Sequence, residues 1–304
     1  MNGAPASLAL RGGVIAAGHG TRLRADGYRV SKPMTPVGGR LLIEHALDRF
    51  RAVGVERATV IVNEQSDDCR QWLADHREDL DLDVIVRTTP SSYASFELVA
   101  ARLAGAPAVI TTVDAIMPVD AFQHFVDSAR RFPSNAIVLG LTDHVDDENP
   151  LWATPDEEGR IRRLGGDRGS HVTAGVYWFP AHRFAAPTAG FDRLRDYLNW
   201  LVERDRPVYG VVLPLVFDID RAHDVQAAEQ AGFRRSPGAT PKQESMSGFA
   251  SQGPHPEEPR ERGPSRRVIQ FGLALAKTPF EMRRPRLRSS GRGGWELPLR
   301  NAGA

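Results

Sequence analysis

Residues Gly12-Gly-Val-Ile-Ala-Ala-Gly-His-Gly-Thr-Arg-Leu23, with Lys32-Pro-Met-Thr-Pro-Val-Gly38 a short distance after them, decide the fold of this chain. The run Val14–Ala17 is apolar and stops at Gly18. This pattern is typical of a buried strand whose carboxyl end opens into a loop. We therefore expect the functional site to begin at this loop.

The loop has the composition of an anion-binding site. Gly18 and Gly20 have no Cβ atoms, so a charged ligand can approach the backbone N–H groups closely. Arg22 and Lys32 bring positive charge to the same place. A polyphosphate is the ligand that these features favour.

Spacing separates this loop from two other glycine-rich loops. A Walker loop has Lys-Ser or Lys-Thr directly after its last glycine, and the dinucleotide-binding fingerprint has a third glycine where this chain has Leu23. The fingerprint also has an acidic residue about 20 positions further on, where this chain has Gly38, Gly39 and Arg40. The sequence excludes both types.

The remaining pattern resembles the signature of the nucleotidyltransferases, which include the sugar-phosphate nucleotidylyltransferases and the MobA-like NTP transferases. It departs from that signature at Ala25 and Ser31, where the family usually has proline, and at Arg40, where it often has lysine. The resemblance implies that Arg22 and Lys32 are catalytic. It also implies a set of nucleotide-binding residues: Ala16, Ala17, Gly18, Gly20, Thr21, Arg22, Lys32 and Ser91.

Lysine usage supports a special role for Lys32. The chain has 39 Lys and Arg residues in total, yet Lys32 is the only lysine before residue 242. A compact point charge is therefore favoured at this position over the planar fork of arginine.

Short apolar runs alternate with helical patterns along the next part of the chain, which predicts βαβ units and a parallel sheet. The resemblance refines this to a Rossmann-like (GT-A-like) α/β fold, with a mostly parallel central sheet flanked by helices. The expected strands are 57–62, 82–87, 108–113, 136–142, 172–179 and 208–213, with a hairpin over 151–164. The expected helices are 39–53, 66–79, 91–104 and 191–204, with one more beginning near residue 119 and another following Asp220.

Two aspartates are candidate ligands of Mg²⁺. Asp114 directly follows a predicted buried strand and should lie beside the glycine loop. Asp218 matches the second metal ligand in the family, whereas Asp220 fits the cap of the following helix. Two alternatives stay open: Asp114 could cap the helix near residue 119, and Asp220 could replace Asp218 as the ligand.

The acceptor side of the predicted site is less defined. Gly175 lies in a segment that resembles the one passing beneath the sugar in the family. The Glu-Lys-Pro sequence that many members carry is replaced by Leu-Gly-Gly-Asp-Arg at 164–168, so Arg168, or else Arg162 or Arg163, is a candidate for the acceptor phosphate. The acidic stretch 143–148 could suggest a metal site, but a solvated loop is favoured.

Residues 233–304 differ in composition from the rest. They hold 14 Lys and Arg against six Asp and Glu, a charge of +8, which leaves −7 for residues 1–232 because the whole chain carries +1. Many prolines and glycines without an apolar period predict a disordered tail after a nucleotidyltransferase domain at 1–232. A nucleic-acid-binding arm is the alternative for the tail, although it has few aromatic residues.

The sequence predicts a nucleotidyltransferase that moves a nucleoside monophosphate from a nucleoside triphosphate to a phosphorylated acceptor, most simply a sugar 1-phosphate, with release of pyrophosphate. We expect it in the cytoplasm, because one cysteine excludes an internal disulfide and no apolar run is long enough to span a membrane. The acidic body makes nucleic acid an unexpected partner. Alternatives are transfer to phosphocholine or molybdenum cofactor, or a non-catalytic nucleotide-binding domain.

Overall fold

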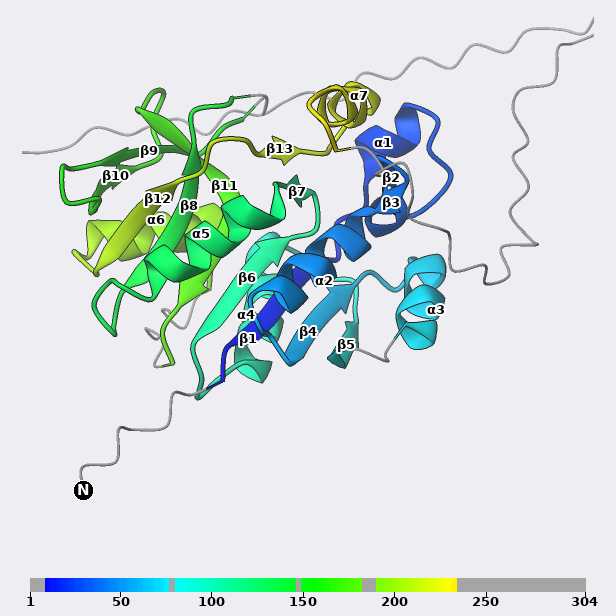
Figure 1. Ribbon diagram of the computed structural model, residues 1–304, viewed down its shortest axis with the longest axis horizontal. Coiled ribbons are helices and arrows are strands. Elements are labelled where there is room, and N and C mark those ends of the chain that lie inside the picture. The colour runs from blue at the N-terminus through cyan, green and yellow to red at the C-terminus, as the bar shows by residue number, and fades with distance from the viewer. Residues whose placement is uncertain (1–8, 77–79, 146–148, 182–189, 234–304) are drawn as a thin grey trace, which may run out of the picture. The chain divides into compact units, whose positions relative to one another are not determined.

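The computed structural model describes residues 9–76, 80–145, 149–181 and 190–233 (Figure 1). The predicted tail at 233–304, except for its first residue, and part of the acidic stretch, 146–148, lie outside these residues. The expected disorder of the tail therefore stays a prediction.

A nine-stranded sheet forms the centre of the fold. Its main path runs β5-β4-β1-β6-β11-β8-β12, and the β9–β10 hairpin extends from one end of β11. Neighbours are parallel from β5 to β6 and again between β8 and β12, whereas β11 is antiparallel to β6 and β8. The strands are β1 Arg11–Ala16, β4 Arg57–Val62, β5 Asp81–Val86, β6 Ala108–Thr112, β8 Ile137–Thr142, β9 Trp152–Pro155, β10 Ile161–Leu164, β11 His171–Phe179 and β12 Val208–Val212. The expected α/β fold with a mostly parallel sheet is confirmed.

Helices cover both faces of the sheet (Figure 1). The helices are α1 Thr21–Ala25, α2 Leu42–Ala52, α3 Asp67–Asp75, α4 Ser92–Arg102, α5 Val119–Ala129, α6 Leu194–Glu203 and α7 Ala222–Gln230, with a 3₁₀ turn η1 at Lys32–Met34. On one face α2 and α5 pack through residues such as Phe50 and Phe122. On the other face α4 and α6 pack through Phe96 and Tyr197. Apolar side chains thus cover both faces of the sheet, as a parallel sheet requires.

No helix in the described part of the chain combines the length and the apolar character that crossing a membrane requires.

Two short ladders were not expected from the sequence. β2 (Pro36–Val37) pairs with β3 (Arg40–Leu41), so α2 begins at Leu42 and not at residue 39. β7 (Ala115–Ile116) pairs with β13 (Phe217–Asp218). This second ladder joins two segments that are about a hundred residues apart in sequence. The predicted metal ligand Asp114 directly precedes β7, and the other one, Asp218, lies in β13.

The prediction that Asp220 caps the last helix is wrong. Arg221 is the N-cap residue of α7, and the backbone N–H groups of Asp220 and Arg221 donate to the carboxylate of Asp224 at 2.9 and 2.7 Å. Because Asp224 satisfies the start of the helix, the side chain of Asp220 is available for other contacts. Asp114 does not cap α5 either, since the N-cap of α5 is Pro118.

Candidate active site

The loop after β1 is open to solvent where a ligand would approach. Gly18 and His19 are exposed, and the preceding turn is held by Asn63, whose side-chain amide donates to the carbonyl of Ala17 at 3.2 Å. Gly20 has φ +59°, and a Cβ atom there would lie 2.9 Å from the Cβ of Lys32. Glycine at this position therefore lets the loop pass directly over Lys32.

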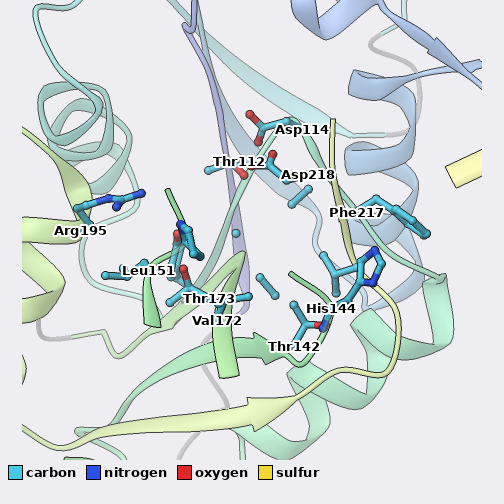
Figure 2. Close-up of a pocket in the computed structure, with 16 residues that line it drawn as sticks. Thr112, Asp114, Thr142, His144, Leu151, Val172, Thr173, Arg195, Phe217 and Asp218 are labelled. Atoms are coloured by element: carbon cyan, nitrogen blue, oxygen red, sulfur yellow. The ribbon is translucent and has the colours of Figure 1, made fainter. Parts of the chain in front are cut away.

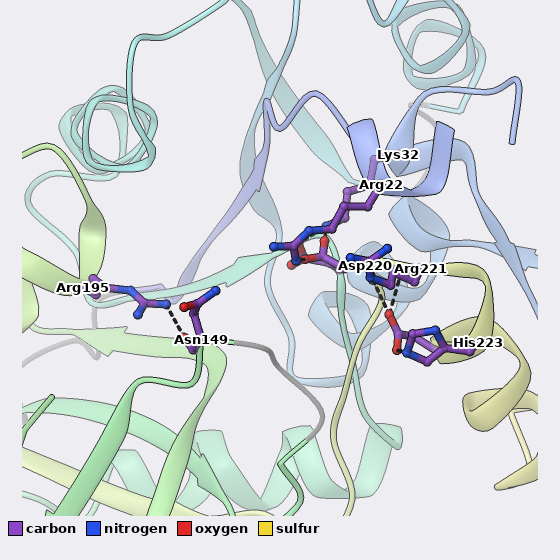
Figure 3. A network of polar contacts seen from close by, with 9 residues as sticks. Arg22, Lys32, Asn149, Arg195, Asp220, Arg221 and His223 are labelled. Carbon is purple, nitrogen blue, oxygen red and sulfur yellow. Dashed lines mark hydrogen bonds and ion pairs between the residues drawn. The ribbon is translucent and has the colours of Figure 1, made fainter. Parts of the chain in front are cut away.

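Lys32 is buried among carboxylates. Only 8% of its side chain is exposed, and its ammonium group donates to Asp114 at 2.6 Å and to Asp220. Arg22 joins the same network by donating to Asp220 at 2.8 Å (Figure 3). The two predicted catalytic cations thus meet at Asp220. The carboxylates that they contact lie about 80 to 200 positions after them in the sequence.

The contacts in this network favour the charged forms of Lys32 and Asp114. Burial alone would lower the pKa of Lys32, but the charges of Asp114, Asp218 and Asp220 raise it well above its usual range. Burial would likewise raise the pKa of Asp114, but the charge of Lys32 and its hydrogen bond lower it below the usual range. Both groups are therefore ionised at neutral pH.

Three carboxylates lie close enough to share a cation. One oxygen atom from each of Asp114, Asp218 and Asp220 lies within 4.8 Å of the others. The β7–β13 ladder places them there, because Ala115 pairs with Asp218, and the N–H of Ile219 donates to the carbonyl of Asp114 at 3.1 Å. Carboxylate oxygens are the ligands that Mg²⁺ prefers in proteins, so the donor set fits this ion.

A buried cation supports the ladder from beneath. The guanidinium group of Arg49, on α2, is 1% exposed and donates to the carbonyl of Ala115 at 2.8 Å. Burial lowers the pKa of Arg49 to about 10, which leaves it charged at neutral pH. The backbone that follows Asp114 is thus fixed from the core side.

A pocket of about 190 Å³ opens beside the carboxylates (Figure 2). Asp114 and Asp218 lie at one side of it and Arg195 at another. The remaining side chains are mostly apolar groups and hydroxyls, among them Leu151, Val172, Phe217, Thr112, Thr142 and Thr173. The pocket can hold one compact polar molecule next to the carboxylates.

Gly175 lines this pocket and has a backbone conformation that favours glycine. It has φ +66°, and a Cβ atom would lie 2.7 Å from the Oγ1 of Thr112 and 2.8 Å from the Cβ of Ala115. The pairing register of β11 with β8 shifts between Thr173 and Tyr177, around this glycine. Glycine is required here so that β11 can bend against the side chains of Thr112 and Ala115, which lie on either side of Asp114 in sequence.

Four other residues that the sequence predicted for the site do not line the pocket. Ser91, which the resemblance assigns to nucleotide binding, accepts a hydrogen bond from the N–H of Ala94 at 3.1 Å, so its hydroxyl caps α4. Arg168 is exposed and does not line the pocket. Arg162 pairs with Asp156 at 2.7 Å, and Arg163 donates to the carbonyl of Arg168 at 2.8 Å. None of these three arginines lines the pocket, so the structure does not bring the candidates for the acceptor phosphate to it.

One residue of the carboxylate cluster was given by the sequence only as an alternative metal ligand, and two residues of the pocket were missed. Asp220 belongs to the carboxylate cluster, and Arg195 and His144 line the pocket. His144 lies in the acidic stretch that was interpreted as a solvated loop, yet its ring packs against Phe217 at 5.0 Å. An arginine near the start of an amphipathic helix gives no sequence signal of its own, so Arg195 could not have been selected.

The fold is that of known nucleotidyltransferase structures. The inositol-1-phosphate CTP transferase of T. maritima superposes with a TM-score of 0.62 at 21% identity, covering 73% of this chain and 95% of that one. A Bacillus anthracis protein assigned as a glucose-1-phosphate thymidylyltransferase, in complex with sucrose, gives 0.66 at 18% identity, covering 76% and 98%.

Residues 12–177 match the MobA-like NTP transferase domain, and the chain belongs to this family. Curated relatives match over shorter segments. CMP-5'-(3-aminopropyl)phosphonate synthase of Streptomyces rubellomurinus is 31% identical over 88 residues, 29% of this chain and 14% of that protein. Bifunctional protein GlmU of Symbiobacterium thermophilum is 39% identical over 62 residues, 20% and 12% of the two chains. The matched segments thus span about one seventh or less of these relatives.

Proposed function

We propose that this protein is a Mg²⁺-dependent nucleotidyltransferase that joins a nucleoside monophosphate to the phosphate of a small acceptor. The observation that carries the proposal is the convergence of Arg22 and Lys32 with Asp114, Asp218 and Asp220 beside an exposed glycine loop and a pocket. Family membership supports the reaction class. The loop would hold the triphosphate and the pocket the acceptor.

The chemistry needs positioning and charge neutralisation. An oxygen of the acceptor phosphate attacks the α-phosphorus, the bond from that phosphorus to the bridging oxygen breaks, and pyrophosphate leaves. Arg22 and Lys32 would neutralise phosphate charge from the loop side. Mg²⁺ held by Asp114 and Asp218, with Asp220 as a further donor, would supply additional positive charge. A phosphate monoester is already ionised at neutral pH, so no general base is required.

A sugar 1-phosphate is our first choice of acceptor. A non-sugar phosphate or a phosphonate is the alternative, and it is supported by the inositol-1-phosphate CTP transferase and the phosphonate synthase among the similar proteins. The cytoplasm is the proposed location, as expected for an enzyme of small phosphorylated metabolites.

One screen tests the proposal. ATP, CTP, GTP, UTP and dTTP are each incubated with Mg²⁺ and a panel containing sugar 1-phosphates, inositol 1-phosphate, phosphocholine and 3-aminopropylphosphonate. We expect pyrophosphate release and a product of matching mass for at least one pair, and a much lower rate of product formation with Lys32→Ala. Nucleotide binding without any product would contradict the enzyme assignment and favour a non-catalytic domain.

A further inference from the structure

The pocket beside the carboxylates contains one arginine that the family pattern does not assign. Among the described residues that line the pocket, the charged groups are Asp114 and Asp218 on one side and Arg195 on another, with His144 as a further titratable group. Figure 2 shows the Arg195 side chain extending from α6 toward the interior of the pocket. An acceptor in the pocket would therefore meet positive charge from the side opposite the loop cations.

The helix that carries Arg195 is well fixed. The N–H of Leu194 donates to the hydroxyl of Ser92 at 3.0 Å, which ties the start of α6 to the start of α4. Leu194, Leu198 and Leu201 are buried in the core behind the sheet. The position of the Arg195 backbone is therefore set by packing rather than by the ligand.

The guanidinium group of Arg195 is oriented by one hydrogen bond and has further N–H donors. One Nη atom of Arg195 donates to the carbonyl of Asn149 at 2.8 Å (Figure 3). A guanidinium group has several N–H donors in a planar fork, so the others can bind an anion in a bidentate manner. No carboxylate of the described residues forms an ion pair with Arg195.

The pKa of Tyr177, in the pocket wall, responds to the charges on both sides of the pocket. Burial raises the pKa of the Tyr177 hydroxyl, the charges of Asp114 and Asp218 raise it further, and Arg195 acts in the opposite direction. The three charged groups therefore act on one buried ring in the pocket wall. A dianion next to the carboxylate cluster would be repelled there unless cations, including Arg195, offset the repulsion.

We propose that Arg195 binds the acceptor phosphate and takes the place of the lysine that many relatives supply from a Glu-Lys-Pro segment. This inference rests on the proposed function and names the residue that selects an anionic acceptor. The fork would hold oxygens of the phosphate that do not attack, leaving the attacking oxygen toward the carboxylates. Arg162, Arg163 and Arg168 have no such role, because none of them lines the pocket.

Chemical protection tests the proposal without knowledge of the substrate. The full chain is treated with phenylglyoxal, which modifies arginines, with and without inorganic phosphate, and the modified residues are quantified by mass spectrometry. We expect phosphate to protect Arg195 severalfold and to leave Arg193 unchanged, since Arg193 is exposed on the same helix terminus. Equal protection of the two, or protection of neither, would overturn the proposal.

Kinetics then separate this inference from the proposed function. With any acceptor found in the screen, Arg195→Gln should raise the acceptor KM about 10- to 100-fold, as expected for a lost hydrogen bond to a charged group. The KM for the nucleoside triphosphate should stay unchanged, Arg195→Lys should recover part of the loss, and Arg193→Gln should behave like the wild type. An active wild type with an unchanged acceptor KM in Arg195→Gln refutes the role of Arg195 alone. No turnover with any pair refutes the proposed function.

Discussion

The nucleotide-side loop and the acceptor-side pocket are built in different ways. The loop is contiguous: residues 16–32 carry the glycines, Arg22 and Lys32 in one short segment. The pocket takes its lining from β6, β7, β8, β11, β13 and α6, and from the segment before β9. A contiguous loop keeps its phosphate-binding groups together as long as the spacing between its glycines, Arg22 and Lys32 is unchanged. A pocket assembled from distant elements can change its specificity through single substitutions that leave the loop untouched.

The largest effect is expected at the junction of the two regions. Asp114→Asn removes a charge that both Lys32 and a bound Mg²⁺ would contact, so turnover should fall below detection. The fold should persist, because the amide keeps the shape of the side chain. Steady-state activity and circular dichroism check the two statements. Near-normal activity of this variant in Mg²⁺ would refute the assignment of Asp114.

Lys32 tests the loop side alone. Lys32→Ala should lose about 2 to 5 kcal/mol of transition-state stabilisation, typical of removing one partner of a buried charge pair. Lys32→Arg should rescue only part of this, because the space beneath Gly20 and between the carboxylates fits a compact ammonium group. The measurement is kcat/KM for the nucleotide. Full activity of the arginine variant would show that charge alone is required.

Gly175 tests the acceptor side through the backbone. Gly175→Ala places a Cβ atom against Thr112 and Ala115 at a positive φ, so it should destabilise the fold by about 2 to 4 kcal/mol. Gly165→Ala is the matched control, since Gly165 has φ +89° but open space around it, and it should cost about 1 kcal/mol. Urea denaturation measures both. Equal losses would mean that the contact with Thr112 and Ala115 has no energetic role.

The pH dependence of stability tests the contact between the regions. The folded pKa of Asp114 lies below its ordinary value of 3.8, so its stabilisation is complete above that pH and is lost as the pH falls through the folded pKa. The folded pKa of Lys32 lies above its ordinary value of 10.5, so its contribution is complete below that pH and is lost above the folded pKa. The stability difference between wild type and Lys32→Met should therefore be flat at neutral pH and shrink in acid. A difference that grows toward pH 3 would contradict the pairing.

The smallest effect is expected from shortening the chain. We propose that the nucleotidyltransferase domain ends near Gly232, which follows α7 and has φ +107°. A chain ending at residue 235 should keep its thermal midpoint within a few degrees and retain transfer activity. Calorimetry and the pyrophosphate assay measure this. Loss of activity that is restored by adding residues 236–304 in trans would instead assign the tail to the active site.

The contiguous parts of the molecule could be predicted from sequence, and the assembled parts could not. The strand at Arg57–Val62 was predicted with its observed bounds, because it is a short run of β-branched residues. The two-residue strands β7 and β13 have no period to detect, yet they bring Asp218 and Asp220 to Asp114. Arg168 was a candidate because it is close in sequence to the missing lysine, and Arg195 was not considered, because only the position of α6 in space brings it to the pocket.

The ammonium group of Lys32 among the carboxylates has a consequence for how the site is loaded. Asp114 and Asp220 already have a counter-ion that is part of the chain, so the fold needs no added cation to relieve their repulsion. An incoming divalent ion must compete with this internal counter-ion for the same oxygens. A triphosphate offers Lys32 another anion, and in doing so it frees the carboxylates for the ion. Nucleotide and metal would thus enter most easily as one complex, with Lys32 exchanging one set of oxygens for another.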